Sequence, residues 1–299
     1  MIDRAVTALS PRLARTAAGG GRACGGTALR IAIGSLACLV LLPAAAVAAD
    51  STPALTDATP AKGWIITLGG TAELGPKYEG ASAAGFSFMP SISWRRVGEA
   101  EGFSAPDDSL DYALYETDRF SFGVAGGWKS GRYSSSSRHL FGMRDVPWSV
   151  EAGVFAEYWP IQDRLRTRVE VRQGFHGHHG IVADFSADWV ERFGRFTLSG
   201  GPRLSLGNAS YMRRNFGVSL PESLANGFMA PYRPSGGAKS VGIATALEYN
   251  WSEQWSTTLF ARYDRMIDQA DGSPLVRTVG QRDQVTVGLG ASYSFRLDL

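Results

Sequence analysis

Three histidines lie within four residues of one another, and this cluster is the strongest candidate for metal chemistry in the sequence. His176 and His178 would share one face of a strand and could ligate a divalent cation, with His179 beside them. Three glycines surround the cluster, and no carboxylate is adjacent in the sequence. We therefore expect a solvated tight turn without a metal, and we keep His176, His178 and His179 as weak candidate ligands.

Charged residues alternate with apolar ones over residues 164–188, which places the charges on one side of two neighbouring strands. Arginines dominate the first strand and aspartates the second. They could line a pore selective for anionic solutes, or form a charge ladder that crosslinks the wall and fills the interior. Rows of both signs favour the ladder, because paired charges cancel the field that a pore would use. The predicted lumen-lining residues are Arg164, Arg166, Arg168, Glu170, Arg172, Asp184 and Asp188.

Residues for nucleophilic or acid–base catalysis are present but poorly placed. Serines 134–137 and His139 lie close in sequence, yet no predicted strand presents Ser and His on one face with an orienting Asn or Asp. Glu151 and Glu157 share a face but are roughly 20 Å apart at the rise of a strand, too far to act on one substrate. We expect no enzymatic activity and no cofactor.

The elements that carry these residues show an alternation of period two. It is clearest over residues 284–299, where apolar or aromatic residues alternate with polar ones or glycine. Segments of about ten such residues with turn residues between them are typical of an outer-membrane β-barrel. A soluble periplasmic sandwich also alternates, but rows of Arg and Asp opposite an almost purely apolar phase favour a wet lumen.

The connections between the predicted strands alternate in length, as the short periplasmic turns and long outer loops of barrels do. The short ones are 97–101, 117–119, 159–164, 191–195 and 251–254, and the long ones are 75–85, 129–147, 207–239 and 266–282. Counting Pro106-Asp107-Asp108 and Phe175 to Gly180 as two further outer loops predicts an antiparallel up-and-down barrel of twelve strands. Ten strands result if 102–116 is one irregular loop. Either number predicts a narrow or plugged lumen.

Residues 1–49 are predicted to be a cleaved signal peptide. Five arginines precede an apolar run, Ile31 to Leu42. Ala46-Val47-Ala48 then supplies the small residues of a cleavage site. A lipoprotein anchor at Cys38 is disfavoured, because Ser35 stands where an aliphatic residue is needed. Removing the signal leaves 25 basic and 27 acidic residues and no cysteine, so a nucleic-acid-binding body and disulfides are not expected. We assign 50–63 to a short periplasmic segment and 64–299 to the barrel.

Several short motifs together resemble the MipA/OmpV family of outer-membrane scaffold-type proteins, over nearly all of the mature chain. They are Pro76 to Gly80, Glu151 to Tyr158, Val171 to Gly174 with Gly177 to Gly180 and Ala183-Asp184, Tyr211-Met212 with Phe216 to Val218, Ser273 to Val276 and Gly280 to Gln284. The sequence departs from the family at its end, where Arg296 to Leu299 follow Phe295.

The resemblance implies a non-enzymatic protein of the bacterial outer membrane, in contact with lipid and lipopolysaccharide. Family members are described as holding a lytic transglycosylase and a murein synthase together, and others as adhesins or proteins of osmotic and antibiotic response. We therefore expect a scaffold, with a narrow solute channel or a surface adhesin as alternatives.

Two regions could contact partners. Residues 207–239 combine aromatic residues with arginines, which suits either a protein-binding surface or a lid packed on its own barrel. Murein enzymes would instead meet the inner turns, which carry Trp159, Pro160, Arg192, Trp251 and Trp255. Anchoring at the membrane interface is the better explanation of these tryptophans.

Overall fold

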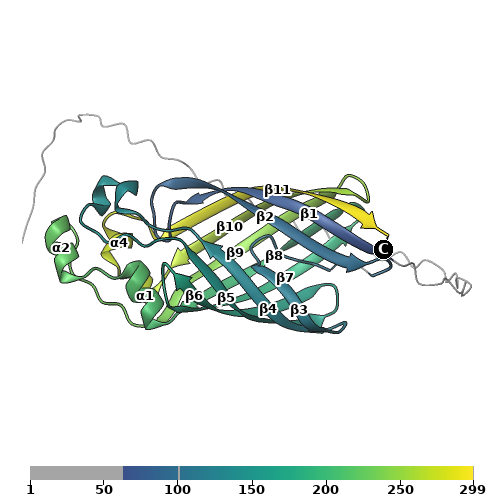
Figure 1. Cartoon of the computed structure of the whole chain (residues 1–299), viewed down its shortest axis with the longest axis horizontal. Helices are drawn as coiled ribbons and strands as arrows, with labels where there is room; N and C mark the ends of the chain where they lie inside the picture. The colour runs from purple at the N-terminus through teal and green to yellow at the C-terminus, as the bar shows by residue number, and fades with distance from the viewer. Residues whose placement is uncertain (1–62, 100–101, 299) are drawn as a thin grey trace, which may run out of the picture. The chain divides into compact units, whose positions relative to one another are not determined.

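The structure is a computed structural model that describes residues 63–99 and 102–298 (Figure 1). The predicted signal peptide and residues 50–62 of the predicted periplasmic segment lie outside the described residues. The described residues form one antiparallel sheet of eleven strands. The strands are β1 (Trp64–Pro76), β2 (Ala84–Arg96), β3 (Leu110–Glu116), β4 (Phe120–Lys129), β5 (Ser149–Ile161), β6 (Leu165–His176), β7 (Ile181–Phe193), β8 (Phe196–Gly207), β9 (Gly237–Asn250), β10 (Trp255–Met266) and β11 (Asp283–Leu297).

Alternation of side chains explains why these segments form strands of a barrel. In β11 the apolar Val285, Val287 and Leu289 are exposed, whereas the polar Gln284, on the other face of the same strand, is buried. The apolar phase therefore faces outward and the polar phase faces the interior, the reverse of a soluble sandwich. Among the described residues, no helix is long and apolar enough to cross a bilayer.

Strand order shows that the barrel is nearly closed. The order is β2-β1-β11-β10-β9-β8-β7-β6-β5-β4-β3, and every neighbouring pair is antiparallel. β2 and β3 are the two ends of this order, with no hydrogen-bonded ladder between them in the described sheet. Alternating directions around the ten pairs make β2 and β3 run the same way. Across this seam the rings of Trp94 and Tyr112 lie 6.0 Å apart.

The predicted twelve strands, and the alternative of ten, are both wrong for the described sheet. β2 ends at the short-turn end of the barrel, and β3 starts at Leu110, opposite Gly126 of β4 and on the far side of the seam from the end of β2. Residues between these two strands could have added another strand at this seam. Instead of joining the wall, residues 102–109 lie inside the barrel, and we call them the plug. Pro106-Asp107-Asp108 is thus not an outer loop, as predicted, but part of the plug.

Short helices gather at the long-loop end of the strands (Figure 1). They are the 3₁₀ helices η1 (Ser134–Ser136) and η2 (Arg138–Leu140), and the α-helices α1 (Ala209–Phe216), α2 (Leu220–Asn226), α3 (Asp268–Asp271) and α4 (Pro274–Arg277). We call residues 208–236, which contain α1 and α2, the lid. Two clusters of buried apolar residues hold the lid down, one around Tyr211 and Phe216 and one around Leu140 and Met229.

Candidate functional site

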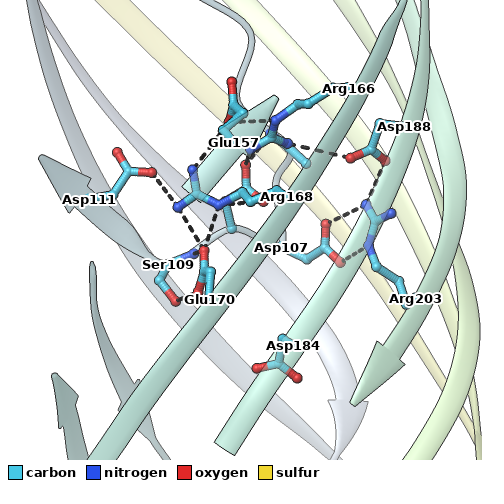
Figure 2. Close-up of polar contacts among 12 residues, drawn as sticks. Asp107, Ser109, Asp111, Glu157, Arg166, Arg168, Glu170, Asp184, Asp188 and Arg203 are labelled. Carbon is cyan, nitrogen blue, oxygen red and sulfur yellow. Dashed lines mark hydrogen bonds and ion pairs between the residues drawn. The ribbon is translucent and has the colours of Figure 1, made fainter. Parts of the chain in front are cut away.

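Arg166 is the centre of a network of charges inside the barrel (Figure 2). Its side chain is 1% exposed. Its Nη2 lies 2.6 Å from Oδ2 of Asp108 in the plug, and its Nε lies 2.7 Å from Oε2 of Glu157 on β5. Its Nη1 is 3.4 Å from Oδ2 of Asp188 on β7. One guanidinium thus ties the plug to two wall strands and is offset by three carboxylates.

The network continues up β6 through residues that alternate toward the interior. Arg168 Nη2 lies 2.5 Å from Oδ2 of Asp111 and 2.7 Å from Oε1 of Glu170. Arg172 contacts Glu170 as well, and its Nη2 lies 2.6 Å from Oδ2 of Asp184. Both signs therefore occur on the inner face of one strand, and each charge has a partner of opposite sign within reach.

The plug is fixed by a second anchor on the opposite side. Asp107 accepts two hydrogen bonds from Arg203 of β8, of 2.8 and 3.0 Å, and one of 3.0 Å from Arg262 of β10. Arg203 also lies 2.8 Å from Asp188, as Figure 2 shows. The hydroxyl of Ser109 donates to Oε2 of Glu170 at 2.6 Å. Three strands that are not neighbours in the sheet therefore meet at the plug, which can only occur across the interior.

Burial makes this network hard to open. Desolvated charges are costly unless each has a partner in good geometry, and removing one partner is more harmful than replacing the whole pair. The arginine forks match carboxylates in pairs of parallel hydrogen bonds. Each arginine of the network pairs with two or more carboxylates from different segments, so the chemistry of the arrangement is that of a crosslink.

Six of the seven predicted lumen-lining residues meet in this network, and one does not. Arg164 belongs to the turn before β6, where its Nη2 lies 3.5 Å from Oε1 of Glu191 and its side chain is exposed. It differs from the others because the alternation that places them begins only at Leu165. Asp184 is the least buried of the six and accepts a 2.5 Å hydrogen bond from Ser205.

A second charged cluster lies beneath the lid, between four segments far apart in the sequence. Glu79 follows β1, and its Oε1 accepts hydrogen bonds of 2.6 and 2.7 Å from Lys129 and Lys239. Its Oε2 accepts a 2.6 Å hydrogen bond from the hydroxyl of Tyr211 in α1. Lys129 also donates to this hydroxyl. We call Glu79, Lys129, Tyr211 and Lys239 the sub-lid cluster.

Electrostatics keep the sub-lid cluster ionised in a defined pattern. Burial raises the pKa of Glu79, but the charges and hydrogen bonds of Lys129 and Lys239 outweigh burial and hold this pKa well below its usual value of 4.5. Burial and the charge of Glu79 raise the pKa of Tyr211 well above 10. The phenol therefore stays protonated at neutral pH and serves as a donor to Glu79.

His178 packs against this cluster rather than lying in solvent. Its ring meets the ring of Tyr211 edge-on at 4.9 Å, and its Nε2 lies 3.0 Å from Oε1 of Glu151. The backbone N–H of Gly180 donates to its Nδ1 at 3.3 Å. That donation assigns the ring proton to Nε2, which donates to Glu151. Both ring nitrogens are thus engaged, and the prediction of a solvated turn is wrong for His178.

The other two histidines point elsewhere. His176 is exposed and its ring lies 4.4 Å from that of Trp148, and His179 is exposed as well. No group of three or more His, Cys, Asp or Glu suited to a metal ion occurs among the described residues. The structure therefore separates the three predicted weak ligands.

Sequence reasoning missed Glu79, Lys129 and Lys239 as site residues, although two signals were available. Glu79, Glu151, His178 and Tyr211 all fall within the motifs behind the family resemblance, and the structure brings these motifs together. Antiparallel register also places Glu151 opposite Gly174, close to the turn that carries His178. The grouping of these residues becomes visible only when the strands that long loops connect are paired with one another.

Residues 207–239 form a lid and also present a surface. Tyr211, Met212 and Phe216 are fully buried against the barrel. Leu220, Leu224 and Phe228 are 61, 76 and 75% exposed. The buried residues suit a lid packed on its own barrel, and the exposed residues suit a protein-binding surface, which are the two roles predicted for this segment.

Several solved structures share a low sequence identity with this chain. A search of curated proteins finds no match. Among solved structures, an outer-membrane channel of Pseudomonas putida F1 is 11% identical, with a TM-score of 0.41 over 82% of this chain and 100% of that one. The NanC porin is 11% identical, with a TM-score of 0.36 over 77% and 98% of the two chains. The outer membrane protein OprG from Pseudomonas aeruginosa is 11% identical, with a TM-score of 0.25 over 79% and 98%.

A family model identifies the chain. The model described as MltA-interacting protein MipA matches residues 68–295. This range begins in β1 and ends in β11, so it covers the sheet, the plug and the lid. The outward apolar phase of the strands agrees with it, because such a surface requires lipid. The chain is an outer-membrane β-barrel protein and belongs to the MipA family.

Proposed function

We propose that this protein is an outer-membrane scaffold that holds murein-synthesising and murein-degrading enzymes at the periplasmic end of a closed barrel. The plug is the observation that carries this proposal. Its two aspartates bind arginines of β6, β8 and β10, so the plug crosslinks three strands of the wall through the interior. A barrel filled in this way suits a support better than a conduit. The family description, which names interaction with MltA, supplies the class of partner.

The short turns are the surface where such partners would bind. Short turns of single-chain outer-membrane barrels face the periplasm, where murein lies. Trp251 and Trp255 at the turn between β9 and β10 are 62 and 52% exposed. Arg195 donates from Nη1 to the carbonyl oxygen of Trp251 at 3.1 Å, which joins this turn to the one before β8. Exposed Trp beside Arg is the composition of protein-binding hot spots.

A pull-down from cross-linked envelopes tests the proposal, with the full-length protein as bait and an unrelated barrel as control. We expect enrichment of a lytic transglycosylase and a murein synthase. Trp251→Ser should reduce recovery at least fivefold, whereas Leu224→Ser on the lid should leave it unchanged. Equal recovery with the unrelated barrel would refute the scaffold.

A surface adhesin is the second candidate, because of the apolar residues exposed on the lid and on the segment between β4 and β5. Phe141 is 72% exposed and Leu224 is 76% exposed, both on the extracellular side. Large exposed apolar side chains are characteristic of interaction surfaces. Binding of whole cells to host matrix that is lost in Leu220→Ser/Leu224→Ser, with the barrel intact, would favour this candidate. Insensitivity of binding to that variant would exclude the lid as the adhesive surface.

A further inference from the structure

Arg132 is a buried cation that lacks a full set of partners. It lies in the extracellular segment between β4 and β5, where its backbone pairs with Val146 through hydrogen bonds of 2.8 and 2.7 Å. The residue is only 5% exposed. Its Nη1 donates to the carbonyl oxygen of Asn215 at 3.2 Å. Its Nε and Nη2 are buried and make no hydrogen bond to the described residues.

Such a group is electrostatically unfavourable in the unliganded protein. A guanidinium carries five N–H donors, and a buried charge is costly unless it is paired. Burial lowers the pKa of Arg132 to about 10; Tyr78 and Glu222 act to raise it, and the positive charges of Arg144 and Arg214 act with burial to lower it. At neutral pH the side chain is therefore still protonated, and its charge is under-compensated.

Nearby acids are committed to other groups. Glu222 accepts hydrogen bonds from the backbone N–H of Arg144 at 3.0 Å and of Ser219 at 2.7 Å, and it caps the first turn of α2. Asp145 accepts a 2.6 Å hydrogen bond from the N–H of Ser134 on the exposed side of the segment. Neither carboxylate is hydrogen-bonded to Arg132, so an additional anion would improve its balance of charge.

A groove lies beside this region on the extracellular side. It lies between residues 134–144 and α2, has a volume of about 640 Å³, and is lined in part by Ser134, Ser135, Arg144 and Glu222. Arg132 does not line the groove itself, but the charges of two lining residues act on it, those of Arg144 and Glu222, whose Nε and Oε1 lie 3.3 Å apart. Arg214 approaches from α1, where its Nε donates to the carbonyl oxygen of Gly177 at 2.7 Å. The groove has room for a phosphate group, and its serines supply hydroxyl donors.

We propose that Arg132, Arg144 and Arg214 form a binding site for a phosphate group that enters from this groove. Arginine suits this ligand, because its planar fork binds phosphate oxygens through two parallel hydrogen bonds. Free phosphate and the phosphates of lipopolysaccharide share this chemistry, and both reach the extracellular side of the outer membrane. The site lies on the face opposite the proposed scaffold surface and is independent of it.

Calorimetric titration of the purified, full-length protein in detergent with inorganic phosphate is the first test. We expect one phosphate per chain. Arg132→Met, which keeps an apolar stem and removes the charge, should weaken binding at least tenfold. Arg233→Met makes the same substitution at an exposed arginine of the lid and should change binding less than twofold. Arg144→Met should weaken binding at least threefold and serves as a second variant if Arg132→Met does not insert.

Thermal unfolding separates a ligand site from a structural arginine. Without phosphate, Arg132→Met should unfold at the same temperature as the wild type or higher, because it removes an under-compensated charge. Phosphate should raise the unfolding temperature of the wild type and of Arg233→Met, but not that of Arg132→Met. Lower stability of Arg132→Met to the same extent with and without phosphate would make the arginine structural and overturn the proposal.

Vesicles with and without lipopolysaccharide distinguish the two sources of the phosphate group. Loss of phosphate binding in lipopolysaccharide-containing vesicles would identify the lipid headgroup as the occupant. Phosphate binding that is equal in both vesicles would identify the free ion. No binding of inorganic phosphate in detergent together with no effect of lipopolysaccharide on wild-type unfolding would refute the site.

Discussion

Removing the two charges of the plug should open a path through the barrel. Asp107→Asn/Asp108→Asn keeps the size of both side chains and abolishes their charge. Asp107 loses its ion pairs with Arg203 and Arg262, and Asp108 loses its pair with Arg166. The plug would then be held by Ser109 and by packing. We expect it to leave the interior more often and to let ions pass.

The size of the effect follows from what each arginine retains. Breaking a buried pair by removing one partner costs about 3–5 kcal/mol. Each arginine keeps another carboxylate, for example Arg203 with Asp188 at 2.8 Å and Arg262 with Asp264 at 2.6 Å, so only part of this applies. A net loss of about 3 kcal/mol for the plug corresponds to a roughly hundredfold larger population of the displaced state.

Single-protein conductance in planar bilayers measures this population as the open fraction. The wild type should be closed nearly all the time. The double variant should open about a hundredfold more often, as a loss of about 3 kcal/mol in the binding of the plug implies. Asp264→Asn is the matched control. It removes the charge of a carboxylate on β10 that pairs with Arg262, but it leaves both aspartates of the plug in place. A correctly folded double variant with the wild-type open fraction would refute the reasoning that the plug closes the lumen.

Three further predictions concern stability, each measured by urea unfolding in lipid vesicles. Arg166→Met leaves three carboxylates without their shared cation and should lower the free energy of unfolding by about 3–5 kcal/mol; a loss below about 1 kcal/mol, the range of an exposed pair, would contradict its central role. Because the folded-state pKa of Glu79 is depressed, its contribution should be present above pH 4.5 and decline as the pH falls further, and a Glu79→Gln variant with the same acid sensitivity would disprove this. Tyr211→Phe removes one hydrogen bond to Glu79 and should cost about 1–2 kcal/mol, whereas a neutral result would show that the lysines suffice.

The alternation of side chains was enough to predict most of the wall. Strands such as β11 carry the pattern without interruption, because one face must meet lipid and the other must be polar. The charge rows of β6 and β7 were visible for the same reason, since Arg166, Arg168 and Glu170 recur at every second position. What local sequence determines is thus the direction of each side chain relative to the wall.

The plug and the sub-lid cluster could not be predicted in this way. Asp107 and Asp108 look like loop residues, because Pro106 and neighbouring polar residues are common in turns. Their position inside the barrel depends on attraction to arginines about 60 to 155 residues away. Glu79 and Lys239 are likewise 160 residues apart. Only the closure of the barrel brings such pairs together, and no local pattern records it.

The odd number of strands excludes an antiparallel ladder at the seam between β2 and β3, because these two edge strands run the same way. Both edges run toward the periplasm, so a strand that paired antiparallel with both would have to run outward. The segment that runs outward is the one containing the plug, and its aspartates bind inside the lumen instead. A second copy inserted in the same orientation offers only the edges β2 and β3, which run the wrong way for antiparallel pairing. The segment between β2 and β3 thus binds the arginines of β6, β8 and β10 through Asp107 and Asp108 in place of adding a strand to the described sheet.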